Sequence, residues 1–374
     1  MAKKEEAGFD LVVVGGGIVG LAHALVGARR GLRVAVVERD QRCVGASIRN
    51  FGFITVTGQR AGETWRRALR SAEVWEEVAQ AAGIPVLQRG LWVAARRLAA
   101  AQVLEAFKAT DMGRECELLS PTAIEGRAPL LRADAGALYS PHELRMESRE
   151  AIPRLTAWLQ EAHGVRFFNG EAVLGVEPGR VHTASSTFCG ERIALCPGTD
   201  LSGPAQAWLP LNLKLSRLQM LRLLPASPVR LPAPVMADLS LVRYAGYSNL
   251  PESKTLLRQL QQECPASLAH GIHLIAVQSA DGSLVVGDSH HDEDASPDPF
   301  ASEAVDALIL KHLHEAVRLP RCEVVERWTG VYLTGHTHDA LIEAPHPGVR
   351  VVLVTSGTGA STAFGLAEDV FQAW

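Results

Sequence analysis

The feature that most constrains this chain is a run of glycines directly after a short apolar segment near the N-terminus. Residues 11–14 read Leu-Val-Val-Val, a continuous and mostly β-branched run that is typical of a buried parallel strand. The next six residues, Gly-Gly-Gly-Ile-Val-Gly, fit the pattern G-x-G-x-x-G at Gly15, Gly17 and Gly20. We expect Gly15 to permit a tight turn, Gly17 to let a pyrophosphate approach the backbone, and Gly20 to let the next helix pack closely on the strand.

The residues after the glycines complete a strand–helix–strand unit. A helix is predicted over residues 18–30 and a second strand over 33–37, with Glu38 at its end. The helix would direct its unpaired N–H groups and its positive dipole end at phosphates. Glu38 follows the glycines by about 20 residues, where an acid accepts hydrogen bonds from an adenosine ribose and disfavours a 2′-phosphate. The alternative is an ordinary glycine-rich turn, but the strands and the acid in register favour a site for FAD or NAD rather than NADP.

Composition narrows the class of protein. At 374 residues the chain is long for a single core, so two connected domains are expected. The sequence is 47% hydrophobic and 21% charged, as in ordinary globular proteins, and its net charge of −4 argues against binding to nucleic acid or anionic membranes. The uncharged run 11–28 contains several glycines, so it is not a membrane segment. Six cysteines without C-x-x-C spacing indicate reduced thiols in a cytoplasmic protein.

The rest of the chain alternates helical and strand patterns. Asp281-Gly282 between two apolar runs is a strong hairpin signal, so the middle of the chain is expected to add an antiparallel sheet. The predicted fold class is therefore α/β with mixed α+β character: a Rossmann-type domain with a parallel sheet and an antiparallel-sheet substrate domain. The last predicted helix runs to Trp374, which leaves a further C-terminal segment open. Helices are predicted over 63–82, 98–112, 120–125, 149–163, 302–317 and 363–374, and strands over 91–95, 165–168, 172–176, 181–183, 191–195, 213–223, 272–277, 283–287, 322–328 and 349–355.

Six motifs occur in the same order as in one known superfamily. They are GGGIVG with Glu38, GASIRNFGF, Cys196-Pro197-Gly198, DGSLVVGDSH, Trp328-Thr329-Gly330 and GTGASTAFGLAE. Together they resemble the FAD-dependent oxidoreductases of the D-amino-acid oxidase, glycine oxidase and sarcosine oxidase superfamily, over residues 9 to about 371. More narrowly, GASIRNFGF and GTGASTAFGLAE are similar to a branch associated with phosphonate breakdown, which acts on aminoethylphosphonate or its N-methyl derivative.

The resemblance implies a domain division and a cofactor. Residues 9–85, 145–210 and 325–374 would form a discontinuous FAD-binding domain, and residues 86–144 and 211–324 the substrate domain. FAD is expected to be noncovalent, because the segment 328–334 lacks the cysteine that holds the flavin in covalent sarcosine oxidases. The implied cofactor-binding residues are Gly15, Gly17, Ile18, Val19, Gly20, Glu38, Arg39, Ala46, Ser47, Arg49, Asn50, Val173, Cys196, Gly198, Gly357, Gly359, Ala360, Ser361 and Thr362.

The implied chemistry is the oxidation of an amine by hydride transfer to the flavin, with hydrolysis of the imine. No side-chain base is strictly required, so no catalytic residue is assigned. An acidic substrate group needs a cation and hydroxyl donors, although each candidate alone is as readily a solvated strand charge or a core tyrosine. The predicted substrate-binding residues are Arg49, Asn50, Lys214, Arg243, Tyr244, Tyr332 and His290, with Arg217, Tyr247 and His336 as further candidates.

Two histidine groups raise the question of a metal. These are the run 290–294, His-His-Asp-Glu-Asp, and the pair His336 and His338. Neither has helical ligand spacing or an evident third ligand, so no metal is predicted.

Several functions stay open at this stage. The leading expectation is an FAD enzyme that oxidises a small primary or secondary amine bearing an acid group, with O₂ or another electron acceptor as partner. A glycine, sarcosine or D-amino-acid oxidase is the alternative within the same class. A noncatalytic flavin-binding protein and an NAD-only dehydrogenase are alternatives of other classes. The sequence gives no signal for the oligomeric state.

Overall fold

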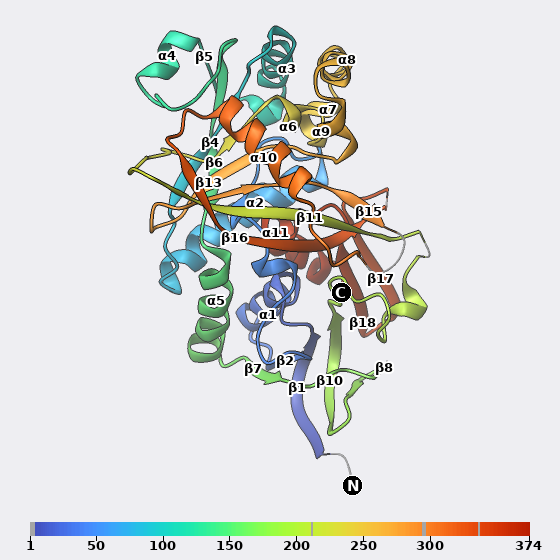
Figure 1. Ribbon diagram of the computed structural model, residues 1–374. Helices are drawn as coiled ribbons and strands as arrows, with labels where there is room; N and C mark the ends of the chain where they lie inside the picture. The colour runs from blue at the N-terminus through green and yellow to red at the C-terminus, as the bar shows by residue number, and fades with distance from the viewer. Residues whose placement is uncertain (1–3, 211, 294–296, 336) are drawn as a thin grey trace.

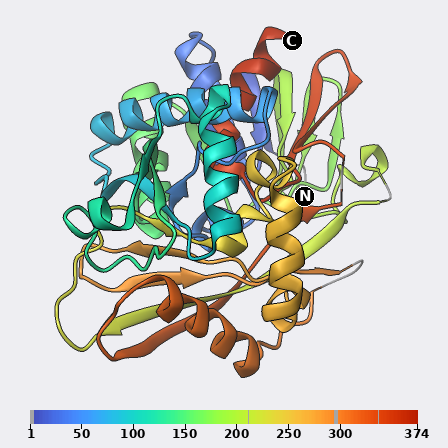
Figure 2. The ribbon, with the colours of Figure 1, turned by 90° about the horizontal axis from the view of Figure 1, so that it is seen from above.

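Two mixed sheets organise the protein. The structure is a computed structural model, and it describes residues 4–210, 212–293, 297–335 and 337–374. In Figure 1 the sheet that contains the N-terminal strand lies below, and the second sheet crosses the molecule above it. Figure 2, viewed from above, shows helices of both halves on the outside of these sheets. This mixed α/β arrangement confirms the predicted fold class.

The first sheet is built around the strand that precedes the glycines. Its order is β17-β18-β10-β1-β2-β7, and β1 runs parallel to both β2 and β10. Strands β7 and β18 continue the parallel set, while β17 is antiparallel to β18. The strands are β1 (Lys4–Val14), β2 (Val34–Glu38), β7 (Arg166–Asn169), β8 (Gly175–Glu177), β9 (Arg180–His182), β10 (Ser186–Leu195), β17 (Ala340–His346) and β18 (Val349–Val354).

Helix α1 lies against this sheet and is apolar nearly all round. It packs on β1 and β2 and also touches α5 and α11, so most of its residues are buried. Gly27 makes the close approach possible, because a Cβ there would lie 2.6 Å from a methyl carbon of Leu11. The helices of this half are α1 (Ile18–Arg29), α2 (Glu63–Ala81), α5 (Ser148–His163) and α11 (Gly359–Gln372).

The second sheet is mostly antiparallel. Its order is β15-β11-β14-β13-β12-β4-β6-β3, with β16 paired to β11 and β5 to β6. The predicted hairpin is confirmed, because β13 and β14 pair antiparallel on either side of Asp281-Gly282. The strands are β3 (Phe53–Ile54), β4 (Gln88–Ala94), β5 (Glu117–Leu119), β6 (Ala137–Arg145), β11 (Lys214–Pro225), β12 (Val235–Met236), β13 (Ile275–Gln278), β14 (Leu284–Gly287), β15 (His291–Glu293) and β16 (Cys322–Thr334).

Short helices and α10 cover the outer side of the second sheet (Figure 1). Helix α4 begins as predicted, with Ser120 accepting a hydrogen bond from the backbone N–H of Ala123. The helices are α3 (Leu98–Lys108), α4 (Pro121–Glu125), α6 (Asp238–Leu241), α7 (Ala245–Ser248), α8 (Ser253–Glu263), α9 (Pro265–Ala269) and α10 (Glu303–Ala316).

Several predicted bounds were wrong. The strand expected over 172–176 is confined to β8, because the residue before it, Leu174, is 65% exposed and lies outside the sheet. The helix expected over 363–374 begins four residues earlier, at Gly359, and ends at Gln372. The strand expected over 322–328 extends to Thr334, because β11 pairs with it along its whole length. The domain boundaries themselves stay a prediction.

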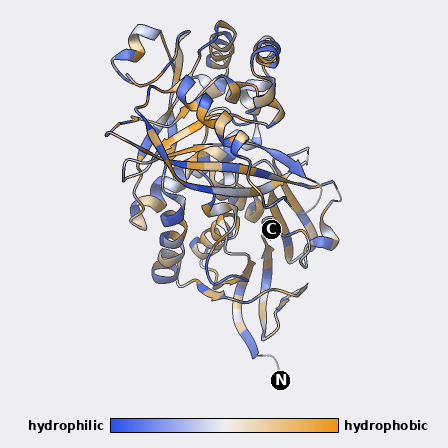
Figure 3. Cartoon of the chain, in the orientation of Figure 1, coloured by the Kyte–Doolittle hydropathy of each residue, from blue (hydrophilic) through white to orange (hydrophobic). Residues whose placement is uncertain are grey.

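The apolar residues gather in the sheets and on the inner faces of the helices (Figure 3). Two large buried clusters result, one in each half of the molecule. Among the described residues, no helix combines the length and the apolar character that crossing a membrane requires. All six cysteines are free thiols.

Candidate active site

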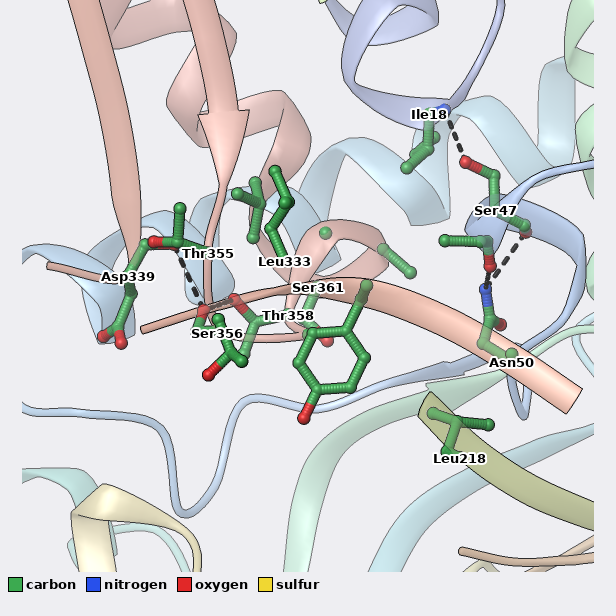
Figure 4. Close-up of a pocket in the computed structure, with 18 of the residues that line it drawn as sticks. Ile18, Ser47, Asn50, Leu218, Leu333, Asp339, Thr355, Ser356, Thr358 and Ser361 are labelled. Carbon is green, nitrogen blue, oxygen red and sulfur yellow. Dashed lines mark hydrogen bonds between the residues drawn. The ribbon is translucent and has the colours of Figure 1, made fainter. Parts of the chain in front are cut away.

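A cavity of about 450 Å³ lies between the two sheets. Its wall combines the glycine loop, the loop after β2, the start of α11, and residues of β11 and β16. In Figure 4, Ile18, Ser47 and Asn50 lie on one side of the cavity and Asp339, Thr355 and Ser356 on the other. The cavity therefore joins both glycine-rich helix starts to the antiparallel sheet.

Most of the predicted site residues line this one cavity. The predicted cofactor-binding residues that line it are Gly17, Ile18, Val19, Gly20, Ala46, Ser47, Arg49, Asn50, Cys196, Gly198, Gly357, Gly359, Ala360 and Ser361. The predicted substrate-binding residues that line it, besides Arg49 and Asn50, are Arg243, Tyr244, His290 and Tyr332.

The glycine loop has the geometry that the motif predicts. Gly15 has φ of +103°, which permits the turn, and a Cβ at Gly20 would lie 1.9 Å from the carbonyl oxygen of Gly15. A Cβ at Gly17 would lie 3.2 Å from the Oγ of Ser47. The backbone N–H of Ile18 donates to that same Oγ at 2.9 Å. The loop after β2 thus closes over the N-terminus of α1, where an anion is favoured.

Glu38 lies beside the glycine loop but outside the cavity wall. Its Oε2 accepts a hydrogen bond from the N–H of Gly16 at 2.6 Å, and its Oε1 accepts from the N–H of Asp40 at 2.9 Å. The carboxylate is therefore held at the end of β2, next to the α1 N-terminus. Arg39 points elsewhere, because it pairs with Asp200 at 3.0 Å.

Asn50 and Arg49 shape the loop that follows Ser47. The amide of Asn50 donates to the carbonyls of Ala46 and Ser47, and its oxygen accepts from the N–H of Gly52. Arg49 donates from Nε to the carbonyl of Val44 at 2.7 Å. Asn50 therefore folds the loop, which is a role beyond the substrate contact that was predicted for it.

The start of α11 forms the second glycine-rich wall of the cavity. Ser361 joins it to the segment directly after β3, because its Oγ accepts a hydrogen bond from the N–H of Thr55 at 2.8 Å. Trp75 on α2 donates from Nε1 to the carbonyl of Ala360 at 2.8 Å. Thr362 lies outside the cavity wall and donates to the carbonyl of Thr358 within its own helix. A helix N-terminus fixed in this way offers a second anion-stabilising end.

Arg243 and Tyr332 bring a cation and a phenol into the cavity. Arg243 lies between α6 and α7 and donates from Nη2 to the hydroxyl of Tyr332 on β16 at 2.8 Å. Within the described part of the chain, Arg243 forms no ion pair with a carboxylate, whereas Arg60 in the same wall pairs with Asp339 at 2.8 Å. Burial raises the pKa of Tyr332 and of Tyr244, so both phenols stay protonated donors.

The same cavity wall contains three further titratable side chains that lie close together: His273, Asp288 and His290. The Nε2 of His273 lies 3.0 Å from Oδ1 of Asp288, and the Nε2 of His290 lies 3.6 Å from Oδ2. The two imidazole rings stack at 4.9 Å with 20° between their planes. Burial moves the pKa of both histidines well below its usual value and raises that of Asp288 to about 7.

The sequence pointed to His290 and missed the other two. The signal was present in the hairpin: β13 pairs with β14, and beyond the paired strands His273 and Asp288 exchange two backbone hydrogen bonds. If the pairing of β13 with β14 is continued by two residues beyond Ile275 and Gly287, His273 comes to lie opposite the segment 288–290. The prediction of no metal rested on histidines that are close together in the sequence, and His273 lies 15 residues before Asp288.

Other predicted candidates lie away from the cavity wall. Lys214 is exposed at the start of β11, and Val173 packs against the small buried cluster of the first sheet. Arg217 pairs with Glu293 at 3.3 Å, and Tyr247 is buried in the core of the second half. His336 lies outside the described residues.

Nearly the whole chain matches the model of one protein family. Residues 10–373 match the family model described as DAO, FAD dependent oxidoreductase. The chain belongs to the DAO family. Comparison with curated proteins finds no match.

Solved structures support the DAO fold. The chain is similar to glycine oxidase from Geobacillus kaustophilus, at 18% identity and a TM-score of 0.74, covering 97% of this chain and 94% of that one. It is similar to L-proline dehydrogenase from P. horikoshii at 16% identity and a TM-score of 0.76, covering 100% and 95%. It is also similar to L-α-glycerophosphate oxidase from Mycoplasma pneumoniae with FAD bound, at 15% identity and a TM-score of 0.73, covering 98% and 95%.

The residues of this DAO protein fit FAD. The glycine cradle has no room for a side chain at Gly20, a Cβ at Gly17 would crowd the Oγ of Ser47, and the α1 N-terminus faces the same cavity. The start of α11 lines that cavity as well, so one elongated ligand can reach both helix ends. The protein is an FAD-dependent oxidoreductase.

Proposed function

We propose that the chain oxidises a small primary or secondary amine that carries an acidic group, aminoethylphosphonate or its N-methyl derivative. Bound FAD would accept a hydride from the carbon next to nitrogen, water would hydrolyse the resulting imine to an aldehyde plus ammonia or an amine, and O₂ or another acceptor would reoxidise the cofactor.

One observation carries this proposal: the cation Arg243 lines the same cavity as the two glycine-rich helix starts. In the described part of the chain, the guanidinium of Arg243 donates to the hydroxyl of Tyr332. Its other N–H groups are therefore available to bind a ligand. A carboxylate or phosphonate bound there would place the rest of a short molecule within the same 450 Å³ as the flavin.

The chain's own residues then position the amine and exclude water. Bound FAD supplies the two-electron acceptor. Arg243 and Tyr332 hold the acidic end, while Leu218, Met220 and Ile275 line the cavity with apolar surface. Such surroundings favour the neutral form of the amine, which is the form that can lose a hydride.

The proposed cofactor contacts follow the cavity wall. Gly17 and Gly20 would receive the pyrophosphate, Glu38 the ribose, and the N-terminus of α11 the flavin end. The attachment is proposed to be noncovalent, since the segment 328–334 has no cysteine. The free thiols of all six cysteines support a cytoplasmic location.

A glycine, sarcosine or D-amino-acid oxidase is the second candidate. One guanidinium with one phenol matches a single carboxylate, and glycine oxidase is among the similar solved structures. A flavin protein without amine chemistry is the candidate of a different class.

An anaerobic absorbance titration separates these functions. The purified protein is titrated with N-methyl-aminoethylphosphonate, aminoethylphosphonate, glycine, sarcosine and D-alanine. Loss of the oxidised flavin band with the phosphonates alone supports the proposal. Bleaching by an amino acid alone replaces it with the second candidate, and a yellow protein that none of them bleaches contradicts both.

A further inference from the structure

The cavity contains a histidine–aspartate–histidine group whose nitrogen and oxygen atoms converge. One ring nitrogen of His273, one of His290 and one carboxylate oxygen of Asp288 all lie within 4.8 Å of one another. His273 precedes β13, and the other two follow β14, so the hairpin holds all three on a rigid support. Nε2 of His273 lies 3.0 Å from Oδ1 of Asp288 and Nε2 of His290 lies 3.6 Å from Oδ2, so each imidazole faces one carboxylate oxygen. Ligand atoms that bind one zinc ion with bonds of about 2.0–2.2 Å have similar separations.

The group is buried, and one of its carboxylate oxygens accepts no hydrogen bond. His273 and Asp288 are each 4% exposed. Oδ1 of Asp288 accepts no hydrogen bond from the residues that the structure describes, although Nε2 of His273 lies 3.0 Å from it. A buried polar atom without a hydrogen bond is unfavourable by about 1–3 kcal/mol, so a ligand that binds Oδ1 is expected.

The orientation of His290 adds an independent observation. Its Nδ1 lies 3.0 Å from the carbonyl oxygen of Gly271 and donates to it, which leaves the lone pair on Nε2 facing Asp288. This second hydrogen bond is the one that metal-binding histidines characteristically make, because it fixes the tautomer and the ring.

A further cation suits the charges in the cavity. Arg49 and Arg243 line its wall together with the buried carboxyl group of Asp288, and Arg60 in the same wall is paired with Asp339. A divalent ion held by Asp288 and the two imidazoles would add to the positive charge of Arg49 and Arg243, so the site would match a phosphonate with two negative charges.

We propose that His273, Asp288 and His290 bind one divalent metal ion of the zinc type, which together with Arg243 holds the acidic group of the substrate. The substrate part of this inference rests on the proposed function, whereas the ion-binding part does not. Two imidazoles and a carboxylate suit Zn²⁺, and three protein ligands leave a position for a phosphonate or carboxylate oxygen.

The test uses the FAD-loaded full chain. Protein freed of metal with dipicolinate is titrated with Zn²⁺ by calorimetry, and the metal content of the untreated protein is measured by mass spectrometry. We expect one ion per chain. We expect Asp288→Asn and His273→Gln to weaken Zn²⁺ binding by more than the roughly 10- to 100-fold that loss of an outer hydrogen-bond partner costs.

The matched control is His182→Gln. His182 also pairs with a carboxylate, Glu177 at 2.9 Å, but it lies on β9, outside the cavity. This variant should bind Zn²⁺ as the parent protein does. If the FAD content and the melting temperature of Asp288→Asn are unchanged, this variant is folded. Its weaker Zn²⁺ binding is then due to loss of the Asp288 ligand.

Two results would overturn the inference: no stoichiometric Zn²⁺ binding by the parent protein, or equal binding by the parent and Asp288→Asn. Failure of the proposed function is seen separately, in the flavin titration. One ion bound with no bleaching by a phosphonate keeps the metal site and removes its proposed substrate. Bleaching by a phosphonate with no ion bound removes the metal site alone.

Discussion

The hydroxyl of Ser47 accepts a hydrogen bond from the backbone N–H of Ile18, 29 positions earlier in the chain, at 2.9 Å. It thereby occupies one of the unpaired donors at the start of α1 and joins the loop after β2 to the glycine loop. We predict that Ser47→Ala weakens FAD binding by about 5- to 30-fold, the equivalent of about 1–2 kcal/mol for a lost helix-capping contact. Fluorescence titration of the apoprotein with FAD measures this. Ser120→Ala, which removes the cap of the distant α4, should leave FAD affinity unchanged.

Glu38 gives a second prediction about the cofactor. Its carboxylate is fixed beside the α1 N-terminus by the N–H groups of Gly16 and Asp40. Glu38→Ala should lower the FAD content of the purified protein, because the ribose loses its acceptor. The FAD content of Glu38→Gln, which keeps the shape of the side chain and one acceptor oxygen, should lie between that of Glu38→Ala and that of the parent protein. An FAD content in Glu38→Ala equal to that of the parent protein would refute the ribose contact.

Arg243 is predicted to anchor the acidic end of the substrate. Arg243→Ala should raise the substrate concentration for half-maximal flavin reduction by about 10- to 150-fold, as expected for a charge-assisted hydrogen bond. The limiting rate of reduction should change less, because the flavin carries the chemistry. Anaerobic stopped-flow measurements give both quantities. Tyr332→Phe should have the same effect on a smaller scale, and Arg149→Ala, in an exposed pair with Glu326, should have none.

His23 predicts a dependence of stability on pH. Burial lowers the pKa of His23 to about 4, and its Nδ1 donates to the carbonyl of Val19 at 2.7 Å. The unfolded chain, with a histidine pKa of about 6.5, binds the proton more readily, so stability falls as pH falls from about 6.5 towards 4. The contribution is about 2 kcal/mol between pH 7.5 and 5. Urea unfolding of the parent protein and of His23→Leu at both pH values measures this contribution. If the free energy of unfolding falls equally in both proteins between pH 7.5 and 5, His23 is not the cause.

Local sequence signals predicted the parts of the fold that depend on neighbouring residues. The glycine loop, α1 and the hairpin at Asp281-Gly282 are specified by contiguous residues, so they were predicted correctly. Strand β6 was missed, because it carries Glu143 and Arg145, which are both fully buried. Glu143 accepts from the N–H of Thr57 at 2.7 Å, and Arg145 pairs with Glu147 at 3.2 Å. These partners exist only in the folded chain, so no alternation of apolar residues marked the strand.

The residues of the candidate site also differ in whether neighbouring residues in the sequence were enough to predict them. Ser47 and Ser361 belong to contiguous motifs, and both line the cavity. His273 and Asp288 become a group only through the register of β13 and β14, so finding them required extending the predicted hairpin beyond its paired strands. Lys214 shows the opposite error: a cation on a predicted strand of the second sheet proved to be exposed at its end.

The tie between Thr55 and Ser361 spans 306 positions of the sequence. Strand β1 likewise takes its place between β2 and β10, and β10 in turn pairs with β18 near the C-terminus. During synthesis, the glycine loop therefore emerges more than 300 residues before the start of α11, which forms the opposite wall of the cavity. The cavity is complete only after both parts have been made, and contacts of such long range favour slow folding.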